Sequence, residues 1–408
     1  MNIYESEVIK DIFLKEGHSV LKSAAGADII VINTCTVTEK ADHKFLHLLK
    51  RVRKDNPEAL IVSLGCYTQL ETDNEILNED SDIILGLNNK FDILDAIKEF
   101  KGDHLVSVPD NQDLEYADHE LLSYQDHTRA FLKVQDGCDN FCTYCTIRYA
   151  RGNSRSRKKE SVMADVRRLA EKDFKEIILT GIDLGSYADG EGYGLSELIT
   201  DIFQVPGFRL RISSVEPWCF DERLIELFVK EKRICPHFHI PLQSASQRIL
   251  KLMNRKYTIN EFDSLIEKLS KRNDVFIATD IIVGFPSETD EEFLESVNYF
   301  INSKIGFAHV FSYSDRPYAP SSRLKAKVSQ NKIAQRSRKL RKVSEEKLHT
   351  FYQLQNVKEK EVIIERITDR KNGIFTYSGL SGNYIPVSFS SDKVYRKGES
   401  VKYIQEND

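Results

Sequence analysis

The chain has 408 residues, of which 41% are hydrophobic and 30% are charged, and its formal net charge is -5. Two or three folded cores are expected, because one domain usually takes about 150 residues, and this composition excludes global disorder. No apolar run approaches the roughly 18 residues of a membrane span, and the start MNIYESEVIK lacks the order of a signal peptide. We therefore expect a cytoplasmic protein that makes no membrane contact.

The first hundred residues predict a small α/β layer domain. Short runs rich in Ile and Val lie at residues 28–33, 59–64 and 82–86, separated by helix-like segments. Such runs are typical of strands buried on both faces of a parallel sheet. We assign residues 1–101 to this domain. Residues 102–128 hold seven Asp or Glu and no Lys or Arg, and are interpreted as an acidic linker.

The central part of the chain predicts a partial barrel of six βα units. The strand candidates are residues 131–135, 176–181, 209–214, 238–243, 276–285 and 307–313. In barrels of this kind the chemistry takes place at the carboxyl ends of the strands. We assign residues 129–356 to this barrel, including a basic helical extension at 321–347 with ten Lys or Arg against two Glu.

The last fifty residues change character and predict a small all-β module, residues 357–408. Alternating runs at 361–367, 373–380, 384–390 and 399–405 are joined by Gly and Asn turns. Four of its aromatic residues, together with the basic run before it, are the pattern of an RNA-binding fold; they are Phe375, Tyr377, Tyr384 and Phe389. The expected fold class is therefore α/β, with a layer domain, a partial barrel and a β module in chain order.

Seven cysteines in a chain without an export signal favour metal-binding or reactive thiols over a disulfide framework. The sharpest pattern is Cys138, Cys142 and Cys145, a C-x3-C-x2-C spacing just after a predicted strand. Three thiolates on one loop can bind three corners of an iron-sulfur cube and leave one iron open for chemistry. A zinc site completed by a histidine, or a buried trio without a ligand, are the alternatives.

This spacing resembles the radical S-adenosylmethionine superfamily, and within it the methylthiotransferases. The resemblance covers nearly the whole chain through an ordered series of motifs, which are Asn33–Thr38, Gly65–Tyr67, Leu179–Gly181, Arg211–Ser214, His239–Ser244 and Asp280–Thr289. It implies a radical S-adenosylmethionine barrel between the first domain and a module similar to the RNA-gripping TRAM domain.

By this resemblance, Cys138, Cys142 and Cys145 hold a 4Fe-4S cluster whose open iron chelates S-adenosylmethionine, and one electron then releases a 5'-deoxyadenosyl radical. The barrel would enclose that radical and keep other C–H bonds away from it. Tyr144 would stack on the adenine of the cofactor. The other residues implied to contact the cofactor are Thr180, Gly181, Ser213, Gln243, Ser244, Val283 and Gly284.

Family members also carry a second 4Fe-4S cluster, held by three cysteines of the first domain. Cys35 and Cys66 match two of them, each at the end of a predicted strand, and the third has no counterpart in this sequence. An upstream start could supply the missing strand and cysteine, Cys219 or Cys235 could complete the set, or the chain is truncated and impaired in sulfur insertion. Two thiolates alone would hold a cube weakly.

Six cations lie within residues 148–159, directly after the cysteine loop. A solvated charged loop is the ordinary interpretation, but the neighbouring loop favours phosphate contact by Arg148, Arg151, Arg155 and Arg157. The expected partners are therefore tRNA and a reductant protein of unknown identity.

The segments 33–38 and 86–90 look most like the threonylcarbamoyladenosine group of the family. The resemblance thus implies that sulfur and a methyl group are inserted at C2 of N6-threonylcarbamoyladenosine 37 in tRNA. Modification of isopentenyladenosine in tRNA or of a ribosomal protein is the alternative within the family. An RNA-binding protein that has lost sulfur insertion, or another radical enzyme using only the Cys138 cluster, are the alternatives outside it.

Overall fold

The computed structural model describes residues 2–111, 115–119, 124, 127–356, 358–371 and 373–404. Parts of the expected acidic linker and the last four residues lie outside this set. The chain forms two compact units, one from residues 1–124, 135–157 and 314–322, the other from residues 125–134, 158–313 and 323–408. The loop with the three cysteines thus packs with the first domain. None of the described helices is both long and apolar enough to cross a membrane.

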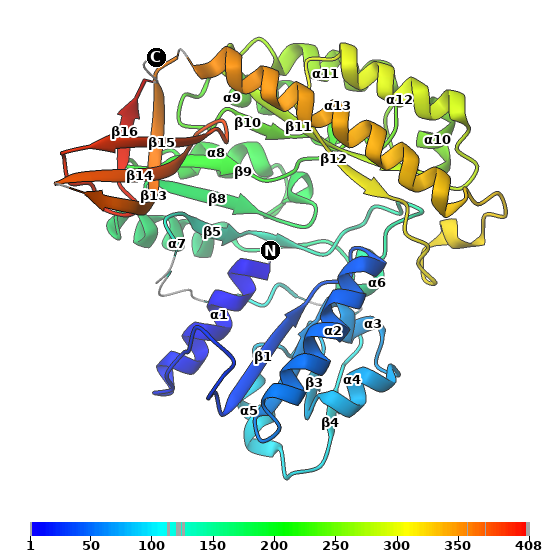
Figure 1. The fold of residues 1–408 in the computed structure, drawn as a ribbon, viewed down its shortest axis with the longest axis vertical. Coiled ribbons are helices and arrows are strands. Elements are labelled where there is room, and N and C mark those ends of the chain that lie inside the picture. Colours follow the sequence, from blue (N-terminus) through cyan, green and yellow to red (C-terminus); the bar gives the residue numbers. More distant parts are fainter. Residues whose placement is uncertain are drawn as a thin grey trace. The chain divides into compact units, whose positions relative to one another are not determined.

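The first unit is built on a parallel sheet of four strands in the order β1-β2-β3-β4 (Figure 1). The predicted strands are confirmed as β1 (Ile29–Thr34), β2 (Leu60–Gly65) and β3 (Ile83–Leu85). The structure adds β4 (Leu105–Ser107), a short run inside the segment interpreted as a linker. The remaining elements are α1 (Asn2–Lys15), α2 (Glu39–Asp55), α3 (Cys66–Leu70), α4 (Glu75–Asp80), α5 (Ile93–Glu99), β6 (Gln135–Asp136), α6 (Ile147–Arg151) and β7 (Arg155–Ser156).

Two hydrophobic clusters cover the faces of this sheet. Ile61 and Ile84 pack with Phe45 and Leu49 of α2, while Val62 and Ile83 belong to a second cluster with Ile9 of α1. These strand residues are fully buried, as expected for a parallel sheet with helices on both faces. Along β1 runs a groove of about 1050 Å³, lined mainly by residues of α1, β1 and the loop between them.

The second unit contains the six predicted barrel strands, which are confirmed. They form two parallel sheets, β5-β8-β9 and β10-β11-β12. Their bounds are β5 (Ala130–Lys133), β8 (Glu176–Thr180), β9 (Arg209–Ile212), β10 (His237–His239), β11 (Phe276–Val283) and β12 (Phe307–Ser312). The helices of this unit are α7 (Lys159–Glu171), α8 (Leu195–Ile202), α9 (Glu222–Lys230), α10 (Gln247–Leu252), α11 (Ile259–Leu269), α12 (Asp290–Asn302) and α13 (Gln330–Asn356).

The long helix α13 packs on β12, the edge strand of its sheet (Figure 1). Ser344 accepts a hydrogen bond from the Ala308 amide at 2.8 Å, and Arg341 donates to the Val310 carbonyl at 2.7 Å. Because an edge strand leaves backbone groups unpaired, these contacts satisfy part of the edge. The exposed side of the helix carries Arg338, Lys339 and Lys342.

The predicted β module is confirmed as a four-stranded antiparallel sheet in the order β15-β14-β13-β16. Its strands are β13 (Lys360–Lys371), β14 (Ile374–Ser381), β15 (Pro386–Ser391) and β16 (Ser400–Tyr403). Of the four aromatic residues singled out in the sequence, Phe375 and Tyr377 are buried in the core of the module, and Phe389 packs against that core. They therefore stabilise the module and do not form an exposed stacking surface.

The module packs against the amino ends of the barrel strands in the same unit. Arg209, the first residue of β9, donates to the Glu361 carbonyl at 2.9 Å, and the ring of Tyr384 lies 4.1 Å from the Arg211 guanidinium. Both arginines bind the fully buried carboxylate of Glu176, the first residue of β8, at 2.7 and 2.6 Å. Although burial opposes ionisation, these two guanidinium groups lower the pKa of Glu176 to about 2.

Candidate functional site

The loop of Cys138, Cys142 and Cys145 is folded by its own backbone. The Cys145 amide donates to the Cys142 carbonyl at 3.0 Å, which closes a tight turn. The Asn140 amide points at the Cys138 sulfur and the Ile147 amide at the Cys145 sulfur, both at 3.4 Å. Amide donors of this kind stabilise a thiolate, which is the form that binds metal. The three thiols are partly exposed and form no disulfide.

Two glycines allow the ends of this loop to meet. Gly137 has φ +69°, and a Cβ atom there would lie 1.9 Å from the Asn153 carbonyl oxygen. Gly152 has φ +72°, and its Cβ would lie 2.2 Å from the Asn111 carbonyl oxygen. A side chain would therefore collide with backbone at both positions, so the loop geometry depends on glycine.

Cys35 and Cys66 follow two neighbouring strands of the parallel sheet in the same unit. Thr34 and Gly65, the residues just before them, are partners in the β1–β2 register. Cys66 is 3% exposed, and burial raises the pKa of its thiol, while the cations of Arg151 and Lys90 act against this rise. The arrangement thus brings two thiols to one edge of the sheet, near two buried positive charges.

Those charges belong to a buried ion-pair network that sequence reasoning missed. The Glu5 carboxylate binds the Lys90 ammonium at 2.7 Å and the Arg151 guanidinium at 2.8 Å, and all three side chains are at most 2% exposed. Arg151 also binds Asp136 at 3.0 Å. The network ties α1 to α6, the helix that directly follows the three-cysteine loop. An acid beside the apolar residues Val8 and Ile9 is a signal for a buried charge, but it does not indicate the partner.

The second unit presents most of the expected cofactor residues at the carboxyl ends of its strands. Thr180 ends β8, Ser213 follows β9, and Val283 ends β11. Thr180 already donates its hydroxyl to the Leu132 carbonyl at 3.4 Å. In parallel α/β folds this edge of the sheet is where ligands bind.

Left-handed backbone marks two of these positions. Gln243 has φ +64°, and its amide donates to the Asp280 carbonyl at 2.7 Å. Gly284 has φ +78°, and a Cβ there would lie 2.3 Å from the Ile333 side chain. A non-glycine residue in this region costs of order 1–3 kcal/mol and persists where the surrounding structure requires it.

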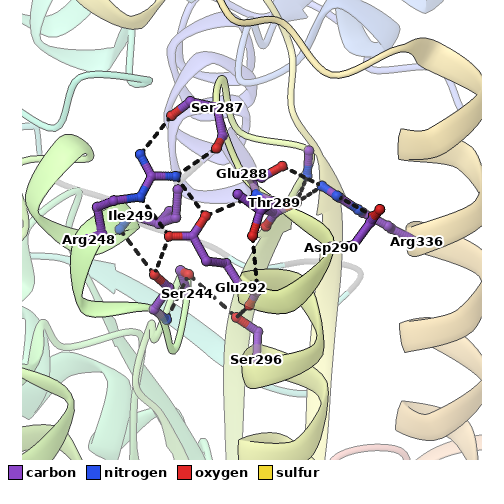
Figure 2. A network of polar contacts seen from close by, with 12 residues as sticks. Ser244, Arg248, Ile249, Ser287, Glu288, Thr289, Asp290, Glu292, Ser296 and Arg336 are labelled. Atoms are coloured by element: carbon purple, nitrogen blue, oxygen red, sulfur yellow. Dashed lines mark hydrogen bonds and ion pairs between the residues drawn. The ribbon is translucent and has the colours of Figure 1, made fainter.

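A polar network ties together the two loops that carry Ser244 and Gly284 (Figure 2). Its centre is Glu292, which accepts hydrogen bonds from Arg248 at 2.7 and 2.8 Å and from Ser246 at 2.9 Å. Arg248 also donates to the Ser287 carbonyl at 2.7 Å. The hydrogen bonds from Arg248, together with the Thr289 amide of the α12 capping box, lower the pKa of Glu292 to about 2.

Comparisons with known proteins agree with this geometry. The model of the radical SAM superfamily matches residues 132–300, and that of the uncharacterized protein family UPF0004 matches residues 1–86. The threonylcarbamoyladenosine tRNA methylthiotransferase MtaB of Aquifex aeolicus is 36% identical over 369 residues, which are 89% of this chain and 90% of that protein. The chain belongs to the radical S-adenosylmethionine methylthiotransferase family.

The name of a second relative of this methylthiotransferase refers to a different modified adenosine. The tRNA-2-methylthio-N(6)-dimethylallyladenosine synthase of Staphylococcus haemolyticus is 34% identical, over 84% of this chain and 69% of that protein. Among solved structures, the radical S-adenosylmethionine methyltransferase TsrM of Kitasatospora setae has a TM-score of 0.57 at 14% identity, covering 78% of this chain and 73% of TsrM. That likeness concerns the fold alone.

The residues of this methylthiotransferase fit the 4Fe-4S cluster and S-adenosylmethionine that its family implies. Gln243 is 8% exposed, and its Oε1 atom has no hydrogen-bond partner among the described residues; the same holds for the Ser213 hydroxyl. Buried polar atoms of this kind are suited to hydrogen-bond a bound cofactor, because leaving such a group without a partner costs about 1–3 kcal/mol. No three described side chains converge on a single metal ion. A cube does not need this, since each thiolate binds its own iron.

The four arginines expected to contact RNA differ in their surroundings. Arg151 and Arg157 are each 2% exposed and pair with Glu5 and Asp118. Because both side chains are buried, neither offers a face to a phosphate, and we do not propose RNA contact by Arg151 or Arg157. Arg148 and Arg155 are partly exposed. Arg148 lies 4.0 Å from the Phe141 ring and donates to the Cys138 carbonyl at 3.3 Å, and so braces the three-cysteine loop.

Proposed function

We propose that this methylthiotransferase acts on tRNA and converts N6-threonylcarbamoyladenosine 37 to its 2-methylthio derivative. The observation that carries the proposal is the similarity to the MtaB relative over nearly the whole length of both chains. The segments 33–38 and 86–90 support the same substrate group. tRNA as the partner implies action in the cytoplasm.

In this mechanism Cys138, Cys142 and Cys145 would hold, through their thiolates, the 4Fe-4S cluster that binds S-adenosylmethionine. When bound, the cluster and S-adenosylmethionine supply the carbon radical that removes hydrogen from C2 of the base. In the second unit, the Gln243 and Ser213 side chains offer buried polar atoms for cofactor binding, and the family resemblance adds Thr180, Gly181, Ser244, Val283 and Gly284 as cofactor-binding residues. Tyr144 is half-buried in the cysteine loop, next to Cys145, and provides a face for the adenine.

A second 4Fe-4S cluster at Cys35 and Cys66 would supply the sulfur. The fit of these residues rests on two thiols at one edge of the sheet, beside the buried cations Arg151 and Lys90. Positive charges stabilise thiolates and the anionic sulfur that they bind. The third ligand is not among the described cysteines at this edge.

RNA contact is proposed for partly exposed cations of one segment and exposed cations of another. Arg148 and Arg155 lie beside the cysteine loop, and Arg338, Lys339 and Lys342 lie on the exposed side of α13. Exposed Lys and Arg groups bind phosphates by releasing condensed counterions, which gives affinity without sequence specificity. Specificity for one adenosine would then depend on the residues at the carboxyl ends of the barrel strands.

The experiment is mass spectrometry of nucleosides from hydrolysed tRNA of a deletion strain. We expect 2-methylthio-N6-threonylcarbamoyladenosine to disappear, to return with the wild-type gene, and to stay absent with Cys145→Ala. The matched control Cys219→Ala, which changes a cysteine of the other unit outside the proposed ligand set, should restore it. An unchanged nucleoside profile in the deletion strain would overturn the proposal. Loss of the 2-methylthio-dimethylallyl nucleoside instead would assign the substrate of the second relative.

A further inference from the structure

Residues 314–322 form a short strap that directly follows β12 and packs with the first unit. At its start, the Ser314 hydroxyl accepts a hydrogen bond from the Glu39 amide at 3.1 Å, and near its middle the Tyr318 hydroxyl donates to the Leu70 carbonyl at 2.7 Å. Sequence reasoning assigned the strap no role. The strap also contacts two segments that carry candidate cluster ligands, the Cys35 segment and the three-cysteine loop.

On the side of Cys35, the strap is anchored by Arg316. Its guanidinium donates to the Thr36 hydroxyl at 2.6 Å and pairs with the Asp42 carboxylate at the start of α2. Arg316 is 4% exposed, Thr36 is fully buried, and both are held in place by this packing. Because a planar guanidinium binds two acceptors at a fixed angle, it fixes the residue next to Cys35 relative to α2.

On the side of the three-cysteine loop, the strap is anchored by its backbone. The Ser321 amide donates to the carbonyl of Thr143, which lies between Cys142 and Cys145, at 2.8 Å. Ser321 and Ala319, two residues before it, are each 1% exposed, so this hydrogen bond is shielded from water. A hydrogen bond made in such surroundings constrains the loop more than an exposed one.

The Cys35 segment and the three-cysteine loop also share a long direct contact. The Thr146 hydroxyl approaches the Thr36 carbonyl at 3.5 Å, the outer limit of a hydrogen bond. The strap supplies two shorter bonds, one to each segment, only five residues apart along the chain. The strap therefore connects the two segments through hydrogen bonds of ordinary length.

We propose that Arg316 is a positioning residue that, through the strap, fixes the separation between the Cys35 segment and the three-cysteine loop. The inference deepens the proposed function and rests on it for its consequence, since sulfur held at Cys35 and Cys66 must meet a base activated beside Cys138, Cys142 and Cys145. A shift of about 1 Å in such an arrangement is enough to cost roughly a hundredfold in rate.

The first test is hydrogen exchange of the full, cluster-free chain carrying Arg316→Gln. We expect exchange to accelerate about tenfold or more in both segments, residues 34–42 and residues 140–150, and at the Ser321 amide. The matched control is Arg53→Gln, an arginine of the same unit that binds Asp82 at 2.6 Å and the Ala59 carbonyl at 3.0 Å. It should accelerate neither segment. Acceleration of one segment alone, or of both by the control, would overturn the inference.

The second test separates positioning from simple loss of structure. In the reconstituted enzyme, Arg316→Gln should keep 5'-deoxyadenosine formation within about twofold of wild type while methylthio product falls about tenfold or more. A parallel fall of both would indicate a merely structural role and contradict the inference. If the wild-type enzyme makes no methylthio product, the proposed function fails, and the exchange experiment still decides the role of the strap.

Discussion

Replacement of Glu5 by Gln tests the buried network beside the candidate cluster ligands. The substitution keeps the size of the side chain and removes the charge that binds Lys90 at 2.7 Å and Arg151 at 2.8 Å. All three side chains are at most 2% exposed, so water cannot replace the lost partner. Breaking a buried ion pair on one side costs about 3–5 kcal/mol, and we expect Glu5→Gln to destabilise the first unit by this amount.

Native-state hydrogen exchange measures this loss directly. The amides of β2 lie in the buried centre of the sheet and report the free energy of opening of the first unit. The control is Asp95→Asn, which removes an ion pair with Lys98 whose side chains are 75% and 69% exposed. Exposed pairs contribute about 0–1 kcal/mol, so the control should change little. Equal effects of the two substitutions would refute the role assigned to the network.

Three further outcomes are expected. The folded-state pKa of Glu176 is about 2, below its usual value, so its ionised carboxylate stabilises the fold by about 3 kcal/mol above pH 4.5, and this stabilisation should be lost as the pH falls toward 2. Denaturant unfolding, followed by the fluorescence of the single tryptophan in the same unit, measures the free energy of unfolding and would show no such loss if the ion pairs were absent. Glu292→Gln should weaken S-adenosylmethionine binding about tenfold in equilibrium dialysis, because the loops of Figure 2 lose their shared acceptor; unchanged affinity would exclude this role. Replacing Arg338, Lys339 and Lys342 by Gln should reduce the salt slope of tRNA affinity by about 2, and an unchanged slope would remove α13 from the RNA interface.

The strands of both units could be predicted from the sequence because their apolar runs follow a simple physical rule. Runs such as 59–64 and 276–285 bury nearly every residue, with only Leu60 and Asp280 partly exposed, as expected for parallel strands between helices. The segment 105–107 was missed because its three strand residues lie among acidic ones, and short edge strands carry little signal of their own.

The candidate site could be predicted only where residues cluster in sequence or end a strand. The spacing of Cys138, Cys142 and Cys145 is local, and so is visible without a structure. Glu5 and Arg151 are far apart in sequence, and nothing in either segment predicts that they meet in the interior. A run of cations likewise does not tell which of them face water, and for this reason Arg157 was expected on the surface and is found buried.

The central claim, a 4Fe-4S cluster on the three-cysteine loop that cleaves S-adenosylmethionine, is tested most directly on anaerobically reconstituted protein. Iron content and 5'-deoxyadenosine formation should be measured for the wild type and for the triple variant Cys138→Ala, Cys142→Ala, Cys145→Ala. The account predicts that the variant holds about four fewer irons per chain and forms no 5'-deoxyadenosine. Equal iron content and undiminished cleavage in the variant would contradict it.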